Sequence, residues 1–291
     1  MSGRAGEQSV MLANEETTAT QARPRLGIPL RERRIALAVL GLLLALCVWE
    51  LVVRAGIVSS QDVPPASEVV RELAQLAGAG AFWGSVGSTT LGAAIGLVIG
   101  AVIGIPIGML MASARPVGLA LHPTVEFLRP VPGIALVPLA VLIWGNSLQA
   151  VSALVAFACV WPFLIQGGHG VRSLNEVARD TARSLRLTRG QRVLWVALPS
   201  SLPSIATGFR ICSGLAIMVA VSAELLSGAP GLGSGILLAQ QGAQVTTMYA
   251  LIVASGLLGI VVNVAVTQAE RRALRWHESQ RQATIEEGTA Q

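Results

Sequence analysis

The sequence predicts an all-α integral membrane fold with six transmembrane helices, and three observations lead to this prediction. Of the 291 residues, 53% are hydrophobic and only 13% are charged, whereas a soluble domain usually has about a quarter charged residues. Six apolar segments approach the roughly 20 residues that cross a bilayer as a helix. The basic residues are distributed very unevenly around these segments. We expect the spans at 35–53, 86–112, 117–145 (interrupted), 148–166, 205–226 and 247–268.

The arginines indicate how the spans are oriented. All 21 basic residues are arginines, and an N-terminus in the cytoplasm would place 18 of them on the cytoplasmic side. Two would then lie outside, and Arg210 would lie within a span. Because positive residues collect in cytoplasmic loops, both termini are predicted to be cytoplasmic. We expect a disordered cytoplasmic arm at 1–34, a membrane domain at 35–276 and a cytoplasmic tail at 277–291.

Glycines recur at every fourth residue of the second span, namely Gly92, Gly96, Gly100, Gly104 and Gly108. Small residues at this spacing form a narrow stripe on one helix face and let two backbones approach closely. The stripe therefore predicts a helix-packing seam, with a hinge or pore-lining role as the alternative.

The third span is interrupted by Pro130, Pro132 and Pro138. Irregular backbone at membrane depth is tolerated only against protein or water. We therefore expect this segment in the interior of the helix bundle and not facing lipid.

The long loop at 167–204 has an internal pattern. Ser173 and Glu176 have the spacing of a capping box, which predicts a helix from Leu174. One face of that helix is small and apolar, comprising Leu174, Val177, Ala178, Thr181, Ala182 and Leu185. The other side carries Glu176, Arg179, Asp180 and Arg183. A second short helix is predicted from about Arg189 to Leu198, ending before Pro199. The apolar face could pack on the chain's own spans, lie on the lipid surface, belong to a solvated link, or dock a partner protein.

This loop resembles the EAA motif of ATP-binding-cassette (ABC) importer permeases, with Asp180-Thr181-Ala182 at its start and Leu198-Pro199 at its end. Three other segments resemble the nitrate/sulfonate/taurine branch of that family: VPPASEVVREL, LRPVPGIALVPLAVLIWG and AELLSGAPGLGSGI. The resemblance covers about residues 35–276. It implies the type I (MetI-like) importer permease fold, a multi-pass location in the plasma or inner membrane, and a permease that works as a dimer.

The resemblance also implies partners and site residues. A separate cytoplasmic ABC ATPase would dock on the loop, and an extracytoplasmic binding protein would deliver the solute. The coupling residues would be Ser173, Glu176, Val177, Ala178, Arg179, Asp180, Thr181, Ala182, Arg183, Leu185, Arg186, Leu198 and Pro199. Asp180 replaces a family glutamate and Arg186 replaces a family glycine. We hypothesise that Arg186 meets an acidic patch on a dedicated ATPase partner.

Three polar residues are candidates for the translocation path: Glu224, Trp144 and Asn146. Glu224 lies at the outer end of the fifth span, where a carboxylate is a candidate functional group. The alternative interpretation is that Glu224 is an interfacial carboxylate that is hydrogen-bonded to the 228–233 turn. Trp144 and Asn146 could edge an entry path or anchor the membrane interface. Glu50 is interpreted as an interfacial residue of a peripheral span.

Catalysis by this chain is not expected. The three cysteines form no CxxC pair and the three histidines are far apart, so no metal site or cofactor is predicted. HExxH, GxSxG and phosphate-loop motifs are absent, so a separate chain would hydrolyse ATP. The alternative function is a secondary transporter or channel without an ATPase, but ionisable residues, which such carriers need for ion coupling, are almost lacking at the span centres.

Overall fold

The computed structural model describes residues 30–59, 61–174, 182, 184–185 and 187–273. The chain divides into two compact units within its first helix, at Cys47 and Val48. In the first unit the described residues are the helical stretch from Leu30 to Cys47, whose leucines are largely exposed. All contacts discussed below lie within the second unit.

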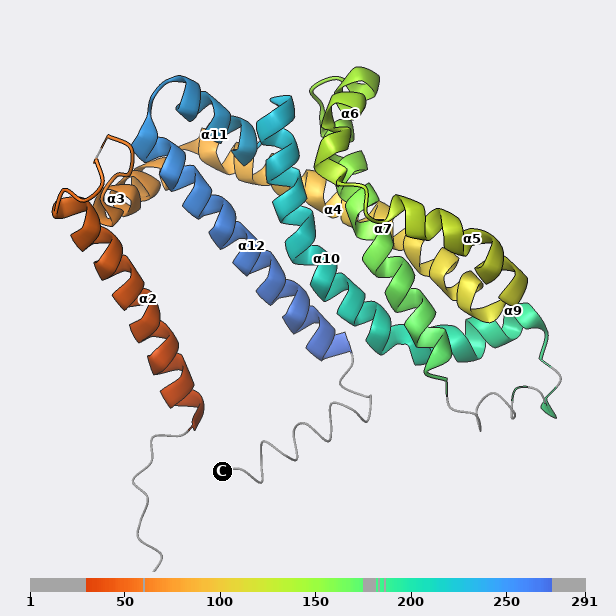
Figure 1. Cartoon of the computed structure of the whole chain (residues 1–291). Coiled ribbons are helices and arrows are strands. Elements are labelled where there is room, and N and C mark those ends of the chain that lie inside the picture. Colours follow the sequence, from red (N-terminus) through yellow and green to blue (C-terminus); the bar gives the residue numbers. More distant parts are fainter. Residues whose placement is uncertain (1–29, 60, 175–181, 183, 186, 274–291) are drawn as a thin grey trace, which may run out of the picture. The chain divides into compact units, whose positions relative to one another are not determined.

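Every regular element among the described residues is helical. In chain order the elements are α2 (Leu30–Arg54), α3 (Ala66–Ala77), α4 (Gly80–Ser113), α5 (Arg115–Leu128), the 3₁₀ helix η2 (Gly133–Leu136), α6 (Val137–Trp144), α7 (Leu148–Arg172), α9 (Arg189–Arg192), the π turn η3 (Val193–Ala197), α10 (Leu198–Ser227), α11 (Leu232–Gln241) and α12 (Val245–Ala273). Figure 1 shows α3 and α11 at one end of this arrangement and α9 at the other. We call these the α11 end and the α9 end.

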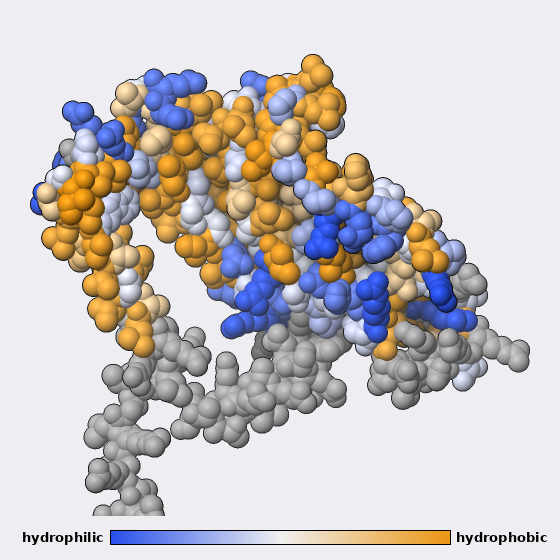
Figure 2. Space-filling view, in the orientation of Figure 1, coloured by the Kyte–Doolittle hydropathy of each residue, from blue (hydrophilic) through white to orange (hydrophobic). Residues whose placement is uncertain are grey.

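Five of these helices are long and apolar enough to cross a membrane, or six if α5 and the η2–α6 segment count as one bent span. Five of the six predicted spans thus coincide with long apolar helices, and the third coincides with the bent pair; the helices extend beyond the apolar windows. For example, α7 continues to Arg172. Figure 2 shows a mostly apolar surface over α10 and α12, with hydrophilic groups toward both ends. This is the surface expected of helices that face lipid across the hydrocarbon core.

The core lies where α4, α7 and α10 pack together. Half of the apolar window of α7 is buried, against 17% of that of α12. The Phe163 ring of α7 meets the Phe209 ring of α10 edge to face, with centroids 4.8 Å apart. Nearby, Cys159 and Cys212 are fully buried, and each thiol donates to the other's backbone carbonyl, at 3.9 and 3.7 Å. Helix α7 is therefore the centre of the second unit.

The interrupted third segment differs from expectation in its burial. Its two halves, Arg115–Leu128 and Gly133–Trp144, meet at an angle of 82°. Helix α5 has no buried residue, and α6 buries only Val137 and Ala140. Within this chain, the prediction of an interior position is therefore wrong. The reason is that the bent segment contacts its neighbours along one side only, which leaves the other apolar side exposed.

The predicted end of the second loop helix before Pro199 is also wrong. Helix α9 continues through the π turn directly into α10, with Pro199 in the first turn of α10. Proline is tolerated there because its ring fits the helical φ and its missing N–H matters least in a first turn. The chain bends at this point, so that α9 leads away from α10 in Figure 1.

Candidate functional site

A buried hydrogen-bond network joins three helices at the α11 end. Glu224, near the end of α10, is only 1% exposed. Its Oε2 atom accepts hydrogen bonds from Thr89 Oγ1 of α4 at 2.9 Å and from Gly233 N of α11 at 3.0 Å. The Thr89 hydroxyl in turn accepts from Leu232 N at 2.9 Å. The carboxylate and the hydroxyl therefore satisfy backbone donors in the first turn of α11, which have no partner inside that helix.

The glycines of the GLG element make this network possible. Helix α10 ends at Gly228, which has a φ of +71° and donates from its amide to the Glu224 carbonyl at 2.8 Å. A Cβ atom on Gly231 would overlap the Glu224 carboxylate, and one on Gly233 would overlap the Val221 carbonyl. Only glycine lets the start of α11 lie this close to α10. The contacts of Glu224 are thus those of a carboxylate hydrogen-bonded to the turn after its own helix.

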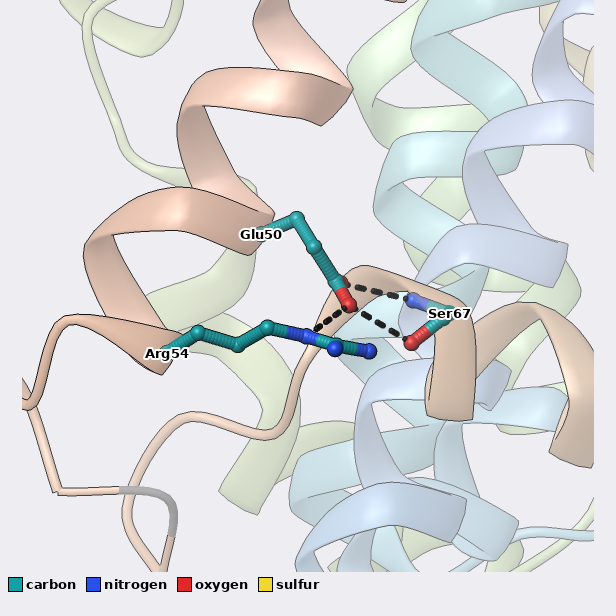
Figure 3. Close-up of polar contacts among 3 residues, drawn as sticks. All are labelled: Glu50, Arg54 and Ser67. Carbon is teal, nitrogen blue, oxygen red and sulfur yellow. Dashed lines mark hydrogen bonds and ion pairs between the residues drawn. The ribbon is translucent and has the colours of Figure 1, made fainter.

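The same end holds a second cluster, drawn in Figure 3. The Glu50 carboxylate of α2 accepts from the backbone N–H and the hydroxyl of Ser67, at 3.1 and 2.8 Å, and from Arg54 Nε at 2.7 Å. Glu50 therefore caps the first turn of α3, where a negative charge is favourable. Helix α3 is also held to α12, because Thr247 Oγ1 donates to Glu72 Oε1 at 2.8 Å.

The two other path candidates lie near the junction of α6 and α7. Trp144 ends α6, and its side chain is 46% exposed. Asn146 is exposed in the turn before α7, and its amide nitrogen would lie 3.7 Å from a Cβ atom placed on Gly228. The turn before α7 therefore lies next to the end of α10, but neither candidate contacts Glu224 directly in the described hydrogen bonds.

The five glycines of the predicted stripe in α4 are buried against α7. A Cβ atom on Gly96 would lie 2.5 Å from Val155 Cβ, and one on Gly100 would lie 2.8 Å from Cys159 Cβ. At Gly104 the nearest atom is a backbone carbonyl oxygen of α7, 2.5 Å away. Gly92 and Gly108 complete the stripe against the same helix. Later glycines face later residues of α7, so α4 and α7 run parallel along this contact.

At the α9 end, the two ends of the long loop pack beneath α4 and α7. Val171 and Ala197 form a buried cluster with Met109. Ser201 Oγ donates to the Ala197 carbonyl at 2.6 Å, in the first turns of α10. A Cβ atom on Gly170 would overlap Ser201, so α7 and α10 are in close contact here. The loop therefore begins and ends on the helices of the core.

Much of the predicted coupling segment lies outside the described residues, namely Glu176, Val177, Ala178, Arg179, Asp180, Thr181, Arg183 and Arg186. Ser173 donates from its hydroxyl to the Gly170 carbonyl at 3.1 Å, at the end of α7. Ala182 is 4% exposed, whereas Leu185 is 67% exposed. Leu198 is partly exposed, and Pro199 is exposed.

Sequence reasoning missed two residues of interest. Trp195, in the π turn, is 74% exposed. A lone tryptophan among the arginines of the loop was the available signal, because exposed aromatic residues often anchor protein interfaces. Thr89 was also missed, since its partner lies 135 residues away and no periodic pattern connects them. Among the described residues, no group of three or more His, Cys, Asp or Glu side chains could hold a metal ion.

Comparison with known proteins identifies one protein family and several relatives that are named as transport permeases. The family profile described as "Binding-protein-dependent transport system inner membrane component" matches residues 104–275. The chain is 30% identical over 234 residues to the putative aliphatic sulfonates transport permease protein SsuC of Bacillus subtilis (strain 168), covering 80% of this chain and 85% of the relative. It is 29% identical over 250 residues to the taurine transport system permease protein TauC of Escherichia coli (strain K12), covering 84% and 91%.

Solved structures show the fold. An inward-facing MetNI methionine ABC transporter aligns with a TM-score of 0.57 and 21% identity, over 65% of this chain and 94% of that chain. A bacterial ABC transporter that imports the acidic polysaccharide alginate aligns with a TM-score of 0.55 and 16% identity, over 83% and 98%. Together with the family profile and the sequence relatives, the resemblance to ABC importer permeases of the nitrate/sulfonate/taurine branch is confirmed.

Proposed function

This chain belongs to the family of binding-protein-dependent transport system inner membrane components, and we propose that it is the permease subunit of an ATP-driven importer. In this proposal an extracytoplasmic protein delivers a small solute, the chain provides the path across the membrane, and a separate ATPase supplies the energy. The observation that carries the proposal is the α9 end, where a loop anchored on α4, α7 and α10 exposes the apolar side chains of Leu185 and Trp195.

The solute we propose is a small molecule of the nitrate, sulfonate or taurine kind. The names of the relatives support this class, since two of them are permeases for aliphatic sulfonates and for taurine. To identify the solute, the binding protein encoded beside this gene is produced, and the shift in its melting temperature is measured with each candidate solute. The absence of both an ATPase gene and a binding-protein gene nearby would count against the importer itself.

The coupling segment in this proposal runs from Ser173 to Pro199 and places the 176–183 region against the ATPase. Because α9 is continuous with α10, a displacement of the docked loop would be passed to the core through the π turn and the Gly170–Ser201 contact. Arg186 would meet an acidic patch of the partner. If Arg186→Glu left complex assembly and ATP-driven uptake unchanged, this contact would be excluded.

The topology we propose has six crossings with both termini in the cytoplasm. The parallel contact of α4 with α7 supports it, because parallel neighbours require a connection that returns across the membrane. The bent segment from Arg115 to Trp144 provides that return. Residues 1–34 and 277–291 would then be a cytoplasmic arm and a cytoplasmic tail. We also propose that two copies form the permease dimer, with the exposed side of α5 and α6 available for contact.

The alternative is a secondary transporter or channel that uses no ATPase. Against it, Oε2 of the Glu224 carboxylate accepts hydrogen bonds from Thr89 and Gly233, a contact pattern that fits a structural role in joining α4, α10 and α11. The deciding experiment is uptake into proteoliposomes that contain the chain, with and without the neighbouring ATPase and binding protein. The importer predicts uptake only with all components and ATP. Uptake by the chain alone would support the secondary transporter.

A further inference from the structure

Arg210 lies near the middle of α10, a helix of 30 residues. It follows Leu198, the first residue of the helix, by twelve positions, which is about 18 Å along the axis. Two residues later, Cys212 packs on Cys159, which adjoins the midpoint of the 25-residue helix α7. The middles of the two core helices therefore lie at the same level. In the proposed topology, the backbone of Arg210 is about 10 Å inside a hydrocarbon core about 30 Å thick.

The guanidinium of Arg210 has no counter-ion among the described residues. Its side chain is exposed, and no described carboxylate forms an ion pair with it. Glu224, the other charged residue of α10, lies about 21 Å further along the axis and is hydrogen-bonded to Thr89 and Gly233. A charge that faces lipid at this depth is costly, so charged residues of spans usually face water or an opposite charge. We therefore expect the Arg210 side of α10 to meet water.

The exposed side of α10 around Arg210 differs from the exposed side of α12. Over 207–218 the large hydrophobic residues exposed on α10 are Ile211 and Met218, and Thr207, Arg210 and Gly214 are exposed between and beside them. On α12 the middle of the helix exposes a row of large aliphatic side chains, namely Ile252, Leu257, Ile260, Val261 and Val264. The aliphatic row is suited to lipid, whereas small and charged residues are unfavourable there. The composition of the α10 face thus agrees with the position of its arginine.

We propose that Arg210 is a specificity-determining residue of the translocation path, where its guanidinium binds the anionic group of the solute near the middle of the membrane. This inference rests on the proposed function, because nitrate, sulfonates and taurine each carry a negatively charged oxygen group. A guanidinium matches such a group with two parallel hydrogen bonds. One exposed guanidinium compensates in part for the water that the anion loses, without holding it so tightly that it cannot leave. The opposite wall of the path would come from the second copy in the proposed dimer.

The first test asks whether water and anions reach this face. A cysteine is placed at Gly214, one turn after Arg210, where an added Cβ atom has no neighbour within 4 Å. The background is Cys47→Ser, because Cys47 is exposed while Cys159 and Cys212 are buried. The complex with its ATPase and binding protein, in phosphatidylcholine liposomes, is treated with the anionic sulfonatoethyl or the cationic trimethylammonioethyl methanethiosulfonate. The rates are divided by those of the same reagents with free cysteine.

We expect Gly214→Cys to react about tenfold faster with the anionic reagent, because a guanidinium about 6 Å away attracts one reagent and repels the other. Adding Arg210→Gln should abolish this preference. The matched control is Gly256→Cys, at an exposed glycine near the middle of α12 that also has no neighbour within 4 Å but lies on the aliphatic side. It should stay unmodified. Absence of modification at Gly214→Cys, or a preference that survives Arg210→Gln, overturns the proposal.

The second test measures ATP-driven uptake of labelled nitrate, taurine and methanesulfonate, supplied separately, by the same complex. Arg210→Gln should lower uptake about tenfold, as expected for the loss of a hydrogen bond to a charged group. Arg210→Lys should retain most of the uptake, and ATP hydrolysis should be preserved in both variants. Arg271→Gln, which removes an exposed arginine at the end of α12, is the control and should leave uptake unchanged.

The outcomes separate the role of Arg210 from the proposed function. Unchanged uptake by Arg210→Gln overturns the role, and so does an equal loss of ATP hydrolysis, which would indicate a structural defect. A defect that appears only when phosphatidylglycerol is added also overturns it, because the guanidinium would then bind a lipid phosphate. If the wild type imports none of the three solutes, the proposed function fails for them, and the reagent preference at Gly214→Cys still decides whether Arg210 attracts anions.

Discussion

The two ends of α10 differ in where their polar and aromatic groups are directed. At the α11 end, Glu224 is buried and its carboxylate is held by Thr89 of α4 and Gly233 of α11. At the α9 end, the hydrogen bonds of the preceding segment are local, as between Arg192 Nε and the Leu187 carbonyl at 2.8 Å, and Trp195 is exposed. The α11 end of the helix is held by buried hydrogen bonds from α4 and α11, whereas the α9 end is held by the packing of Ala197 and Ser201 against α4 and α7 and carries the exposed Trp195 ring beside it.

This difference indicates how a motion could pass along the helix. At the α11 end, buried hydrogen bonds to α4 and α11 resist displacement. At the α9 end, the exposed Trp195 ring offers a partner a contact, and the packing against α4 and α7 would pass a displacement to the core. In an importer driven from the α9 end, α10 would be moved at its Trp195 end and restrained at its Glu224 end. The following predictions test each half of this comparison, beginning with the largest effect.

Removing the Glu224 carboxylate should cause the largest loss of stability. Glu224→Ala leaves Gly233 N–H and the Thr89 hydroxyl without their acceptor, at about 1–3 kcal/mol for each buried donor. The thermal unfolding midpoint in detergent should fall clearly. The Glu224→Gln variant keeps a carbonyl oxygen as acceptor, so its unfolding midpoint should fall less. As control, Glu68→Ala removes an exposed carboxylate of α3 and should change the midpoint little. Equal effects of Glu224→Ala and Glu68→Ala would show that the α11 end is not fixed by this network.

Between the two ends, the α4–α7 contact should not tolerate an added methyl group. Gly104→Ala places a Cβ atom against a backbone carbonyl of α7, which a side-chain rotation cannot relieve. We expect a loss of about 1–3 kcal/mol in the free energy of unfolding, as for other overpacked sites. Gly84→Ala, in the same helix with no atom within 4 Å of its added Cβ, should be neutral or slightly stabilising. Similar results for both variants would contradict a close packing seam.

The helices of the second unit could be predicted well from sequence, because long apolar segments have few alternatives in a membrane. The glycine spacing also identified the face of α4 that meets α7. The course of the chain through Pro199 was not predicted, since proline is compatible with the first turn of a helix as well as with its end. The exposure of α5 and α6 was missed because hydropathy does not report how a proline-rich junction bends.

The Glu224 network shows a second limit. The sequence singled out the carboxylate and the nearby GLG element but left open whether they contact each other. Its other partner, Thr89, belongs to a helix more than a hundred residues earlier, so only the packing of α4 against α10 and α11 brings the three together. One threonine among the residues of an apolar span has no periodic signature. Contacts of this kind are set by tertiary structure and require coordinates.

At the α9 end, Trp195→Ala should impair coupling without destabilising the chain. The side chain is mostly exposed, so the unfolding midpoint should stay close to that of the wild type. If Trp195 anchors the ATPase, its removal should weaken the complex by about tenfold, as expected for an interface aromatic residue. Binding of the detergent-solubilised permease to immobilised ATPase measures this. Trp195→Phe should retain part of the affinity. A lower unfolding midpoint with unchanged binding would place Trp195 among the internal contacts instead.

The smallest effect is expected where α3 meets α12. Thr247→Val keeps the shape of the side chain but removes the hydrogen bond to Glu72, which costs about 0.5–1.5 kcal/mol for a typical bond and less where water can replace the donor. The unfolding midpoint should therefore fall only slightly. Thr246→Val is the matched control, because the structure describes no side-chain hydrogen bond for Thr246. A loss as large as that of Glu224→Ala would mean that α3 contributes as much to fixing the α11 end as the buried network does. The difference between the two ends of α10 would then depend on α3 and α12 as well as on α4 and α11.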